Sequence, residues 1–383
     1  MELYFDNAAT TKCSKKAAEA VLEALTCVYG NPSAMHAKGV QAEKKVQAAR
    51  STLARLLKAE ESEIIFTSGG TESDNLALAG VVQAAARTGN HVITTAVEHP
   101  AVSEPVRRLR ESGCEVTVLP VDGDGAVDLA DLKAAMRSTT VLVSVMYVNN
   151  EIGTIMPIAE IGAWLKKEYP AVVFHVDAVQ AFGKYKIFPK RLGIDLLSVS
   201  AHKLHGPKGI GLLYIRKGVK CKPQILGGGQ QLGLRSGTDN VPGIMGLAIA
   251  AEESYEHMEE NAQSMRACKM RLLAGLQEIE RVVVHGAPEK TAEHIVSASF
   301  LGIGSEVLLH TLEERGIYLS AGSACATHKK NVSPTLSAMQ TGREEMESVV
   351  RFSFSGQNTP EEVEICLQVL KECVPKLRRY TAR

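Results

Sequence analysis

The stretch that decides the fold reads Ser198-Val-Ser-Ala-His-Lys-Leu-His-Gly-Pro-Lys-Gly-Ile-Gly211. An apolar run at residues 194–199 leads into it and another at 210–215 follows, which predicts two strands joined by a glycine-rich turn. Lys203 stands between them, next to His202. Desolvation at the end of a sheet favours the neutral amine, the form that makes a Schiff base with an aldehyde. Because most lysines are solvated, Lys203 indicates a cofactor site only if the rest of the chain supplies the other groups.

Length and composition indicate an ordinary globular protein. The chain has 383 residues, of which 45% are hydrophobic and 22% charged, and its 43 basic residues balance 43 acidic ones. Two domains are expected at this length, and the lack of a basic excess argues against direct nucleic-acid binding. No stretch is apolar enough to span a bilayer and no secretory signal begins the chain. We therefore expect a cytoplasmic protein without a membrane partner.

The eight cysteines are scattered along the chain, and none forms a C-x-x-C pair. This spacing suggests neither a disulfide framework nor a zinc site, so we expect no metal. Reduced thiols are typical of the cytosol, which agrees with the expected location.

A phosphate-binding turn is predicted at residues 68–71. A short β-branched run at 64–67 precedes Ser-Gly-Gly-Thr, and helical composition follows. Free N–H groups at a helix N-terminus bind anions, Gly70 allows a phosphate to approach closely, and Thr71 adds a hydroxyl donor. An ordinary strand-to-helix turn has the same pattern, so the turn alone does not decide the matter.

Polar side chains also come at or just after the ends of other predicted strands, in the order His99, Asn150, Asp177 and, three residues later, Gln180. Open α/β sheets bind their ligands at the carboxyl ends of the strands. A buried carboxylate there needs a partner, and a pyridinium N–H is one. Together with Lys203 and the phosphate turn, this order favours a lysine-bound pyridoxal phosphate.

From about residue 246 the pattern changes. We predict a long charged helix at 248–279, and then short strands at 282–285, 296–300, 317–320 and 349–354. A C-terminal helix should begin with Thr359 as N-cap and Pro360 as first residue. This second part is a smaller α+β domain.

Stretches that match the motifs of one protein family extend from residue 4 to about 356. They lie at residues 4–11, 30–33 with His36, 67–75, 98–99, 148–153, 175–180, 200–211, 235–238, 323–325 and 351–353. The most specific are Ser200-Ala-His-Lys203 and Gly322-Ser-Ala-Cys325. The sequence resembles the cysteine desulfurases of the NifS and IscS type, within the class-V aminotransferase-like enzymes. The resemblance implies the α/β fold type I of pyridoxal-phosphate-dependent transferases. A large domain at 15–255 would hold a mostly parallel seven-stranded sheet sandwiched by helices. Residues 1–14 and 256–383 would form the smaller domain, which carries the catalytic cysteine loop.

The resemblance also assigns roles around the cofactor. Lys203 would carry pyridoxal 5′-phosphate, Asp177 would keep the ring nitrogen protonated, and His99 would stack on the ring and move protons. The residues expected to hold the phosphate are Gly70, Thr71, Ser200, His202 and, reaching over from the neighbouring subunit, Thr238. A homodimer with shared active sites follows from that last contact.

The remaining implied roles concern the substrate, L-cysteine. Asn150 and Gln180 would contact the ring oxygen and the substrate, and Arg351 would pair with the substrate carboxylate. Cys325, in a loop of small residues, would attack the substrate sulfur and become a persulfide, leaving L-alanine. The sulfur would then pass to an acceptor, either an iron–sulfur scaffold or a protein of tRNA or thiamin thiolation.

Several alternatives stay open on the sequence. His328, Lys329 and Lys330 depart from the small hydroxyl residues of many relatives, and they either lower the thiol pKa, recruit an acidic acceptor or form a solvated charge run. Selenocysteine lyase or another class-V reaction would use the same fold, and a non-catalytic sulfur-assembly scaffold would keep it. A Rossmann nucleotide binder is disfavoured, because G-x-G-x-x-G does not follow the first strand.

Overall fold

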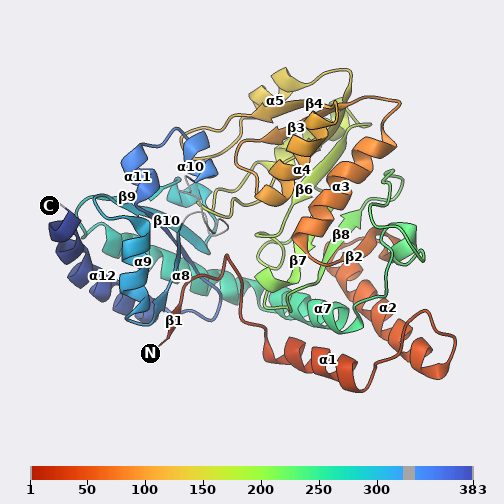
Figure 1. The fold of residues 1–383 in the computed structure, drawn as a ribbon, viewed down its shortest axis with the longest axis horizontal. Coiled ribbons are helices and arrows are strands. Elements are labelled where there is room, and N and C mark those ends of the chain that lie inside the picture. The colour runs from red at the N-terminus through yellow and green to blue at the C-terminus, as the bar shows by residue number, and fades with distance from the viewer. Residues whose placement is uncertain (1, 322–332, 382–383) are drawn as a thin grey trace.

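The computed structural model describes residues 2–321 and 333–381. Figure 1 shows two α/β parts side by side. The larger part holds a sheet beneath α3 (Gly70–Ala84) and α4 (Pro100–Glu111), and the smaller part is bordered by α8 (Met258–Leu276), α9 (Ser305–Glu313) and α12 (Pro360–Thr381).

The larger sheet has seven strands, in the order β2 (Ile64–Thr67), β8 (Gly211–Ile215), β7 (Leu196–Ser200), β6 (Val173–Asp177), β5 (Thr140–Ser144), β3 (His91–Thr95) and β4 (Glu115–Leu119). The five strands from β7 to β4 are parallel, whereas β8 runs antiparallel to both β2 and β7. The turn that contains Lys203 leads straight from β7 into β8, which is why these two strands are antiparallel. The predicted mostly parallel seven-stranded sheet is confirmed.

Helices cover both faces of this sheet because its strands are apolar on both faces, as buried parallel sheets are. Leu196 packs with α3 and α4 on one face, and its neighbour Leu197 packs on the other. That second face is covered by α2 (Ala37–Leu57), α5 (Leu129–Ala135), α6 (Ile158–Glu168) and α7 (Val241–Glu256). Helix α1 (Lys15–Thr26) packs against α7.

The smaller part is built on an antiparallel sheet of four strands, β12 (Ser320–Ala321), β13 (Val349–Ser353), β10 (Ile295–Phe300) and β9 (Val282–His285). A parallel pair, β1 (Leu3–Tyr4) and β11 (Ile317–Tyr318), and the short helices α10 (Pro334–Ala338) and α11 (Arg343–Glu347) complete the elements. Phe5 packs with Phe300 and Phe352 in one apolar cluster, so the N-terminus joins this part. The domain boundaries at 14/15 and 255/256 stay a prediction.

Local chemistry explains where three helices begin. The single helix expected at 248–279 is wrong, because the backbone leaves helical geometry at His257 and separates α7 from α8. The cap of α2 is His36, whose Nδ1 accepts from the N–H of Gly39 at 3.3 Å. At the C-terminal helix the expected cap is confirmed, since Thr359 Oγ1 accepts from the N–H of Glu362 at 3.3 Å.

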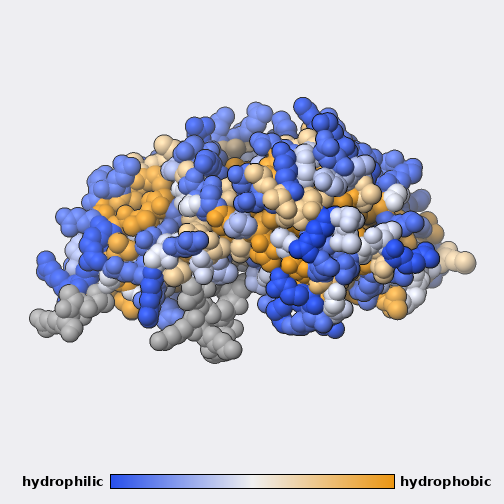
Figure 2. Space-filling view, turned by 90° about the horizontal axis from the view of Figure 1, so that it is seen from above, coloured by the Kyte–Doolittle hydropathy of each residue, from blue (hydrophilic) through white to orange (hydrophobic). Residues whose placement is uncertain are grey.

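Figure 2 shows the molecule from above, with hydrophilic residues over much of this face and hydrophobic residues between them. Within residues 2–321 and 333–381, no helix is both long enough and apolar enough to cross a membrane.

Candidate active site

A cavity of about 570 Å³ lies where the carboxyl ends of β5, β6 and β7 meet the N-terminus of α3 and strand β13. This volume is typical of a small-molecule site. Its walls include most of the residues expected from the sequence, namely Gly70, Thr71, His99, Asn150, Asp177, Gln180, Ser200, His202, Lys203 and Arg351. Segments far apart in the chain are therefore brought together as the strand-end argument requires.

Two expected residues are not among these walls. Thr238 is exposed in a loop of its own chain and is not one of the described residues that line the cavity. Cys325, with His328, Lys329 and Lys330, lies outside the described residues.

Lys203 ends a single 3-10 turn, Ala201–Lys203, directly after β7. Its Nζ donates to the carbonyl oxygen of Ala8 at 2.6 Å and to that of Ala9 at 2.7 Å. Gln180 Nε2 donates to the same Ala8 oxygen at 2.9 Å. The lysine amine is therefore held at the cavity wall by backbone carbonyls, a contact that the sequence analysis missed. The matching stretch at residues 4–11 was the available signal.

The N-terminal segment that supplies these carbonyls is itself fixed to both sheets. Thr11 donates through its N–H and its hydroxyl to the carbonyl of His202, at 2.8 and 3.0 Å. The N–H of Ala8 donates to Ser353 Oγ on β13 at 2.8 Å. The segment thus connects the Lys203 turn to the smaller sheet.

One end of the cavity is suited to a phosphate. Helix α3 begins there, and the first N–H groups of a helix have no partner within it. A Cβ on Gly70 would lie 2.6 Å from Val179 Cγ2, so the close packing of Val179 against the start of α3 requires glycine at this position. Ser200 and His202 line the same cavity. Burial and the charge of Lys203 lower the pKa of His202 to about 4, so it acts as a neutral imidazole.

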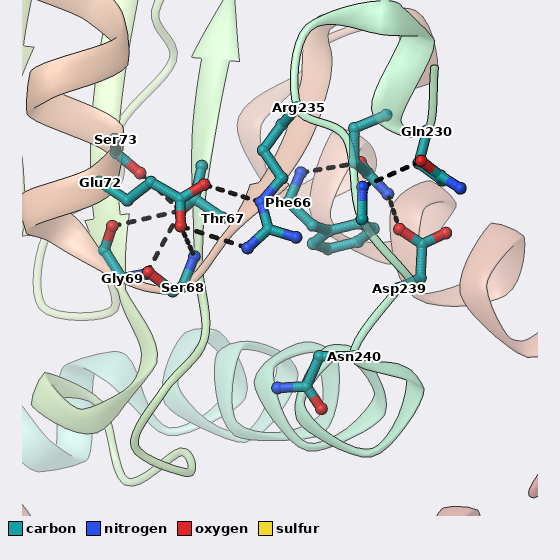
Figure 3. A network of polar contacts seen from close by, with 12 residues as sticks. Phe66, Thr67, Ser68, Gly69, Glu72, Ser73, Gln230, Arg235, Asp239 and Asn240 are labelled. Carbon is teal, nitrogen blue, oxygen red and sulfur yellow. Dashed lines mark hydrogen bonds and ion pairs between the residues drawn. The ribbon is translucent and has the colours of Figure 1, made fainter. Parts of the chain in front are cut away.

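Figure 3 shows how the first turn of α3 is tied to the exposed loop that carries Thr238. Glu72 Oε2 accepts from the N–H of Ser68 at 2.8 Å, and Glu72 Oε1 accepts from Arg235 Nε at 2.8 Å. Earlier in the loop, Gln231 Oε1 accepts from the N–H of Phe66 on β2 at 2.9 Å. These contacts hold the loop at residues 225–240 beside the phosphate end of the cavity.

The other end of the cavity is suited to a cationic ring nitrogen. Asp177 is the last residue of β6, is 6% exposed, and accepts from the N–H of Val179 at 2.9 Å. Burial first, and then the charge of Asp74, raise the pKa of Asp177 to about 7. Gln180 Oε1 is buried without a hydrogen-bonding partner in the described part of the chain. The Asp177 carboxyl and Gln180 Oε1 are therefore both suited to bind a polar group of a ligand.

His99 is the N-cap of α4, and its Nδ1 accepts from the N–H of Ala101 at 3.1 Å. An accepting Nδ1 carries no proton, so in the neutral ring the proton is on Nε2. Burial and the charge of Lys203 lower the pKa of His99 to about 4, which keeps the ring neutral. The cap therefore fixes one tautomer, with an N–H available at Nε2.

Arg351 reaches the cavity from β13 and is only 2% exposed. Nη1 donates to the carbonyl of Asn150 at 2.7 Å, and Nη2 donates to Asp6 Oδ1 at 2.9 Å. Nε is buried and has no hydrogen-bonding partner among the described residues. A buried guanidinium with an unused donor is suited to bind a carboxylate.

The sequence analysis gave no role to three titratable groups near the site, of which two are buried and Lys184 is half-buried. Asp74 lines the cavity, and burial raises its pKa to about 7. Burial raises the pKa of Glu98, which bridges the ends of β3 and β5, to about 8. Lys184 Nζ donates to the carbonyl of Lys203 at 3.0 Å, and burial lowers its pKa to about 7. Helical spacing from Gly70 was the available signal for Asp74.

The donors around the cavity fit pyridoxal phosphate. A helix N-terminus with a hydroxyl and an imidazole suits the phosphate, the unpartnered Gln180 oxygen suits a ring substituent, and the buried Asp177 carboxyl suits the pyridine nitrogen. Lys203 supplies an amine for the aldehyde.

Comparison with known proteins agrees with this geometry. The family model of class-V aminotransferases matches residues 3–366. The cysteine desulfurase IscS of Methanosarcina thermophila is 44% identical over 99% of this chain and 93% of its own length. A solved NifS-like protein superposes with a TM-score of 0.93 at 38% identity, covering 98% of this chain and 100% of its own. A structure described as SspA in complex with cysteine has a TM-score of 0.82 at 32% identity, covering 92% of this chain and 98% of its own. With the whole length matched and the cavity built for a lysine-bound cofactor, the chain belongs to the class-V aminotransferase family and, within it, to the cysteine desulfurases.

Proposed function

We propose that this pyridoxal-phosphate-dependent cysteine desulfurase transfers the sulfur of L-cysteine to its own Cys325. L-Cysteine and the Cys325 thiol give L-alanine and Cys325–S–SH. The substrate C–S bond breaks and an S–S bond forms. The Cys325 thiol loses its proton and the substrate β-carbon gains one, so the protons balance. The reaction needs no external oxidant, and the outer sulfur then passes to an acceptor.

The observation that carries the proposal for Cys325 is that none of the seven other cysteines, all in the described part of the chain, lines the cavity. Burial raises the pKa of several of them, to about 12 for Cys221 and about 11 for Cys268, which makes poor nucleophiles. The described residues on both sides of the Cys325 segment also support the proposal. Ser320 on β12 lies opposite Arg351 on β13 in the antiparallel sheet, and Pro334 lines the cavity.

Bound pyridoxal phosphate supplies an electron sink for charge that develops at the substrate α-carbon. Gly70, Thr71, Ser200 and His202 would hold its phosphate, and Lys203 its aldehyde carbon. Asp177 would keep the ring nitrogen protonated, because a buried carboxylate stabilises a cation opposite it. His99 and Lys203 would move protons at the substrate. His99 would use the N–H at its Nε2, and Lys203 would use the amine that the Ala8 and Ala9 carbonyls hold.

Substrate binding is proposed to depend on Arg351. We expect Arg351→Lys to raise KM for L-cysteine roughly tenfold to a hundredfold, because a charged hydrogen-bond pair contributes about 1.5–3 kcal/mol and lysine cannot reproduce the two-pronged geometry. Steady-state kinetics would check this, with Arg343→Lys on the exposed side of α11 as control. An unchanged KM would remove Arg351 from substrate binding.

We also propose a homodimer in which Thr238 reaches the partner's cofactor phosphate. The loop that carries Thr238 exposes Ile225, Leu226 and Leu232, and Leu226 is 79% exposed. Large apolar side chains grouped on one polar loop are typical of an interface.

Leu226→Lys is expected to weaken the dimer and, with it, cofactor retention, because a lysine ammonium would have to be desolvated in the interface. Sedimentation would measure the shift toward monomer, and absorbance after dialysis would measure the cofactor. Val307→Lys on α9, where the valine is 47% exposed, is the matched control. A Leu226→Lys protein that stays as dimeric as the control would contradict this interface.

The cytoplasm suits this proposal, because a reactive thiol must stay reduced between turnovers. The proposed reaction is tested by incubating purified protein with L-cysteine. Alanine and persulfide should form in equal amounts in a single turnover, and the persulfide should map to the peptide that contains Cys325. Activity with L-selenocysteine and none with L-cysteine would instead identify a selenocysteine lyase.

A further inference from the structure

The loop at residues 225–240 presents the side chain of Thr238 to the outside of its own subunit. Thr238 is exposed and is not one of the described residues that line the chain's own cavity. Five residues of this loop are glycine, and glycine loses more conformational freedom on ordering than any other residue. A loop of this composition does not hold a side chain in place by itself, so contacts with the rest of the chain have to do so.

An ion pair between Glu72 and Arg235 joins the loop to the first turn of α3. Arg235 Nε donates to Glu72 Oε1 at 2.8 Å, and Arg235 Nη2 donates to Glu72 Oε2 at 3.4 Å. The Arg235 side chain is 23% exposed and the Glu72 side chain 15%. Figure 3 shows the Glu72 carboxylate lying between Ser68 and the Arg235 guanidinium. A two-pronged ion pair that is largely shielded from water holds a defined geometry better than an exposed pair does.

The residues on both sides of Thr238 are held as well. The N–H of Gly237 donates to Gln230 Oε1 at 2.9 Å, and Asp239 Oδ1 accepts from Gln231 Nε2 at 2.7 Å. Gln231 is only 5% exposed, and its Oε1 accepts from a backbone N–H of β2 at 2.9 Å. The chain around Thr238 is therefore fixed to the body of the subunit, while the Thr238 side chain stays exposed.

The backbone of the loop is also held in an unusual conformation. Gln231 and Leu232 have φ angles of 48° and 58°, in the left-handed region that residues with a side chain rarely adopt. Such residues persist where their surroundings determine the conformation, and they are found disproportionately at ligand-binding sites. The fixed shape of this glycine-rich loop therefore points to a function for the side chain that it exposes.

We propose that Glu72 and Arg235 are positioning residues that hold the Thr238 hydroxyl in place for the cofactor phosphate of a second copy of this chain. The inference rests on the proposed function through one point, the homodimer in which Thr238 reaches the partner's phosphate. Because the ion pair orders the loop in advance, phosphate binding does not have to overcome the entropy cost of ordering it. The same ion pair links the phosphate end of one cavity, at the start of α3, to that of the other.

The test uses mixed dimers of the full chain, in which the two copies carry different affinity tags and are purified through both. One copy is silenced by Lys203→Ala, so the visible absorbance of lysine-bound cofactor reports only the site of the other copy, the reporting copy. The phosphate at that site would be contacted by Thr238 of the silenced copy. Titration with pyridoxal 5′-phosphate gives the dissociation constant of the reporting site, and sedimentation checks that the dimer is intact.

Arg235→Gln in the silenced copy should raise the dissociation constant of the reporting site roughly threefold to tenfold, because the phosphate then has to order the loop itself. The same substitution in the reporting copy should leave that constant unchanged, because the loop that faces the reporting site is intact. The matched control is Arg107→Gln, which breaks an exposed ion pair on α4 and should have no effect in either copy.

Arg235→Gln and Thr238→Ala placed together in the silenced copy should weaken binding no more than Thr238→Ala alone, since the ion pair acts through that hydroxyl. Additive losses would show that Arg235 acts by another route and would contradict the proposal. If Arg235→Gln prevents folding or dimer formation, Glu72→Gln in the silenced copy makes the same test. Glutamine can still accept from the N–H of Ser68 but lacks the charge that pairs with Arg235.

The arrangement of the copies separates the possible results. A loss of affinity only when Arg235→Gln is in the reporting copy would show a local role at its own α3 and overturn the proposal, as would no loss in either arrangement. Thr238→Ala in the silenced copy tests the proposed function separately. If Thr238→Ala weakens binding and Arg235→Gln does not, only the inference fails. If Thr238→Ala has no effect, the shared phosphate contact of the proposed function fails, and the inference fails with it.

Discussion

Lys203→Ala is expected to abolish the visible absorbance of lysine-bound cofactor and to lower desulfurase activity roughly a thousandfold or more, because no other group replaces a covalent catalytic residue. The Lys203 amine lies at the cavity wall, where the Ala8 and Ala9 carbonyls hold it at 2.6 and 2.7 Å. Alanine removes both the attachment point and the group that exchanges protons with the substrate.

Absorbance spectra before and after borohydride treatment, followed by peptide mapping, would check this result. The matched control is Lys222→Ala, since Lys222 is an exposed lysine that does not line the cavity among the described residues. It should keep both colour and activity. A Lys203→Ala protein that retains borohydride-reducible colour would refute the assignment of Lys203.

Cys325→Ser is expected to separate binding from sulfur transfer. The variant should bind cofactor and L-cysteine as wild type does, because the cavity walls in the described part of the chain do not depend on that thiol. Sulfide release under reducing conditions should fall roughly a thousandfold or more, because a serine hydroxyl is a far weaker nucleophile than a thiolate at neutral pH.

Sulfide release and alanine formation would be measured together, with spectral titration by L-cysteine as the readout of binding. Cys27→Ser is the matched control, because Cys27 is an exposed thiol at the end of α1. Sulfide release by Cys325→Ser at the rate of this control would remove Cys325 from the mechanism.

Much of the site follows from local pattern joined to one topological rule. Residues at the ends of parallel strands meet at one edge of the sheet, so His99, Asp177 and the Lys203 turn were expected to come together. The cavity brings them together. The rule works because each short apolar run specifies a buried strand, and the polar residue just after it has only one edge to occupy.

Long-range contacts were the ones that the sequence pattern did not reveal. The Ala8 and Ala9 carbonyls meet Lys203 across more than half of the chain, and nothing in an alanine pair marks it as an acceptor for a lysine. The break at His257 was also missed, because helical composition runs on through both α7 and α8. For the Lys203 contact, packing between distant segments and not local propensity decided the outcome.

The sequence by itself determined the class of fold, the kind of cofactor and the identity of most groups around it, because residue type and strand-end position are local properties. Only the tertiary structure decided the state of those groups. The pKa of Asp177 depends on burial and on Asp74, which lies on another element, and the tautomer of His99 depends on an N–H of α4. Burial and through-space charge arise from the three-dimensional packing of segments that are remote in sequence, so no single stretch of chain contains them.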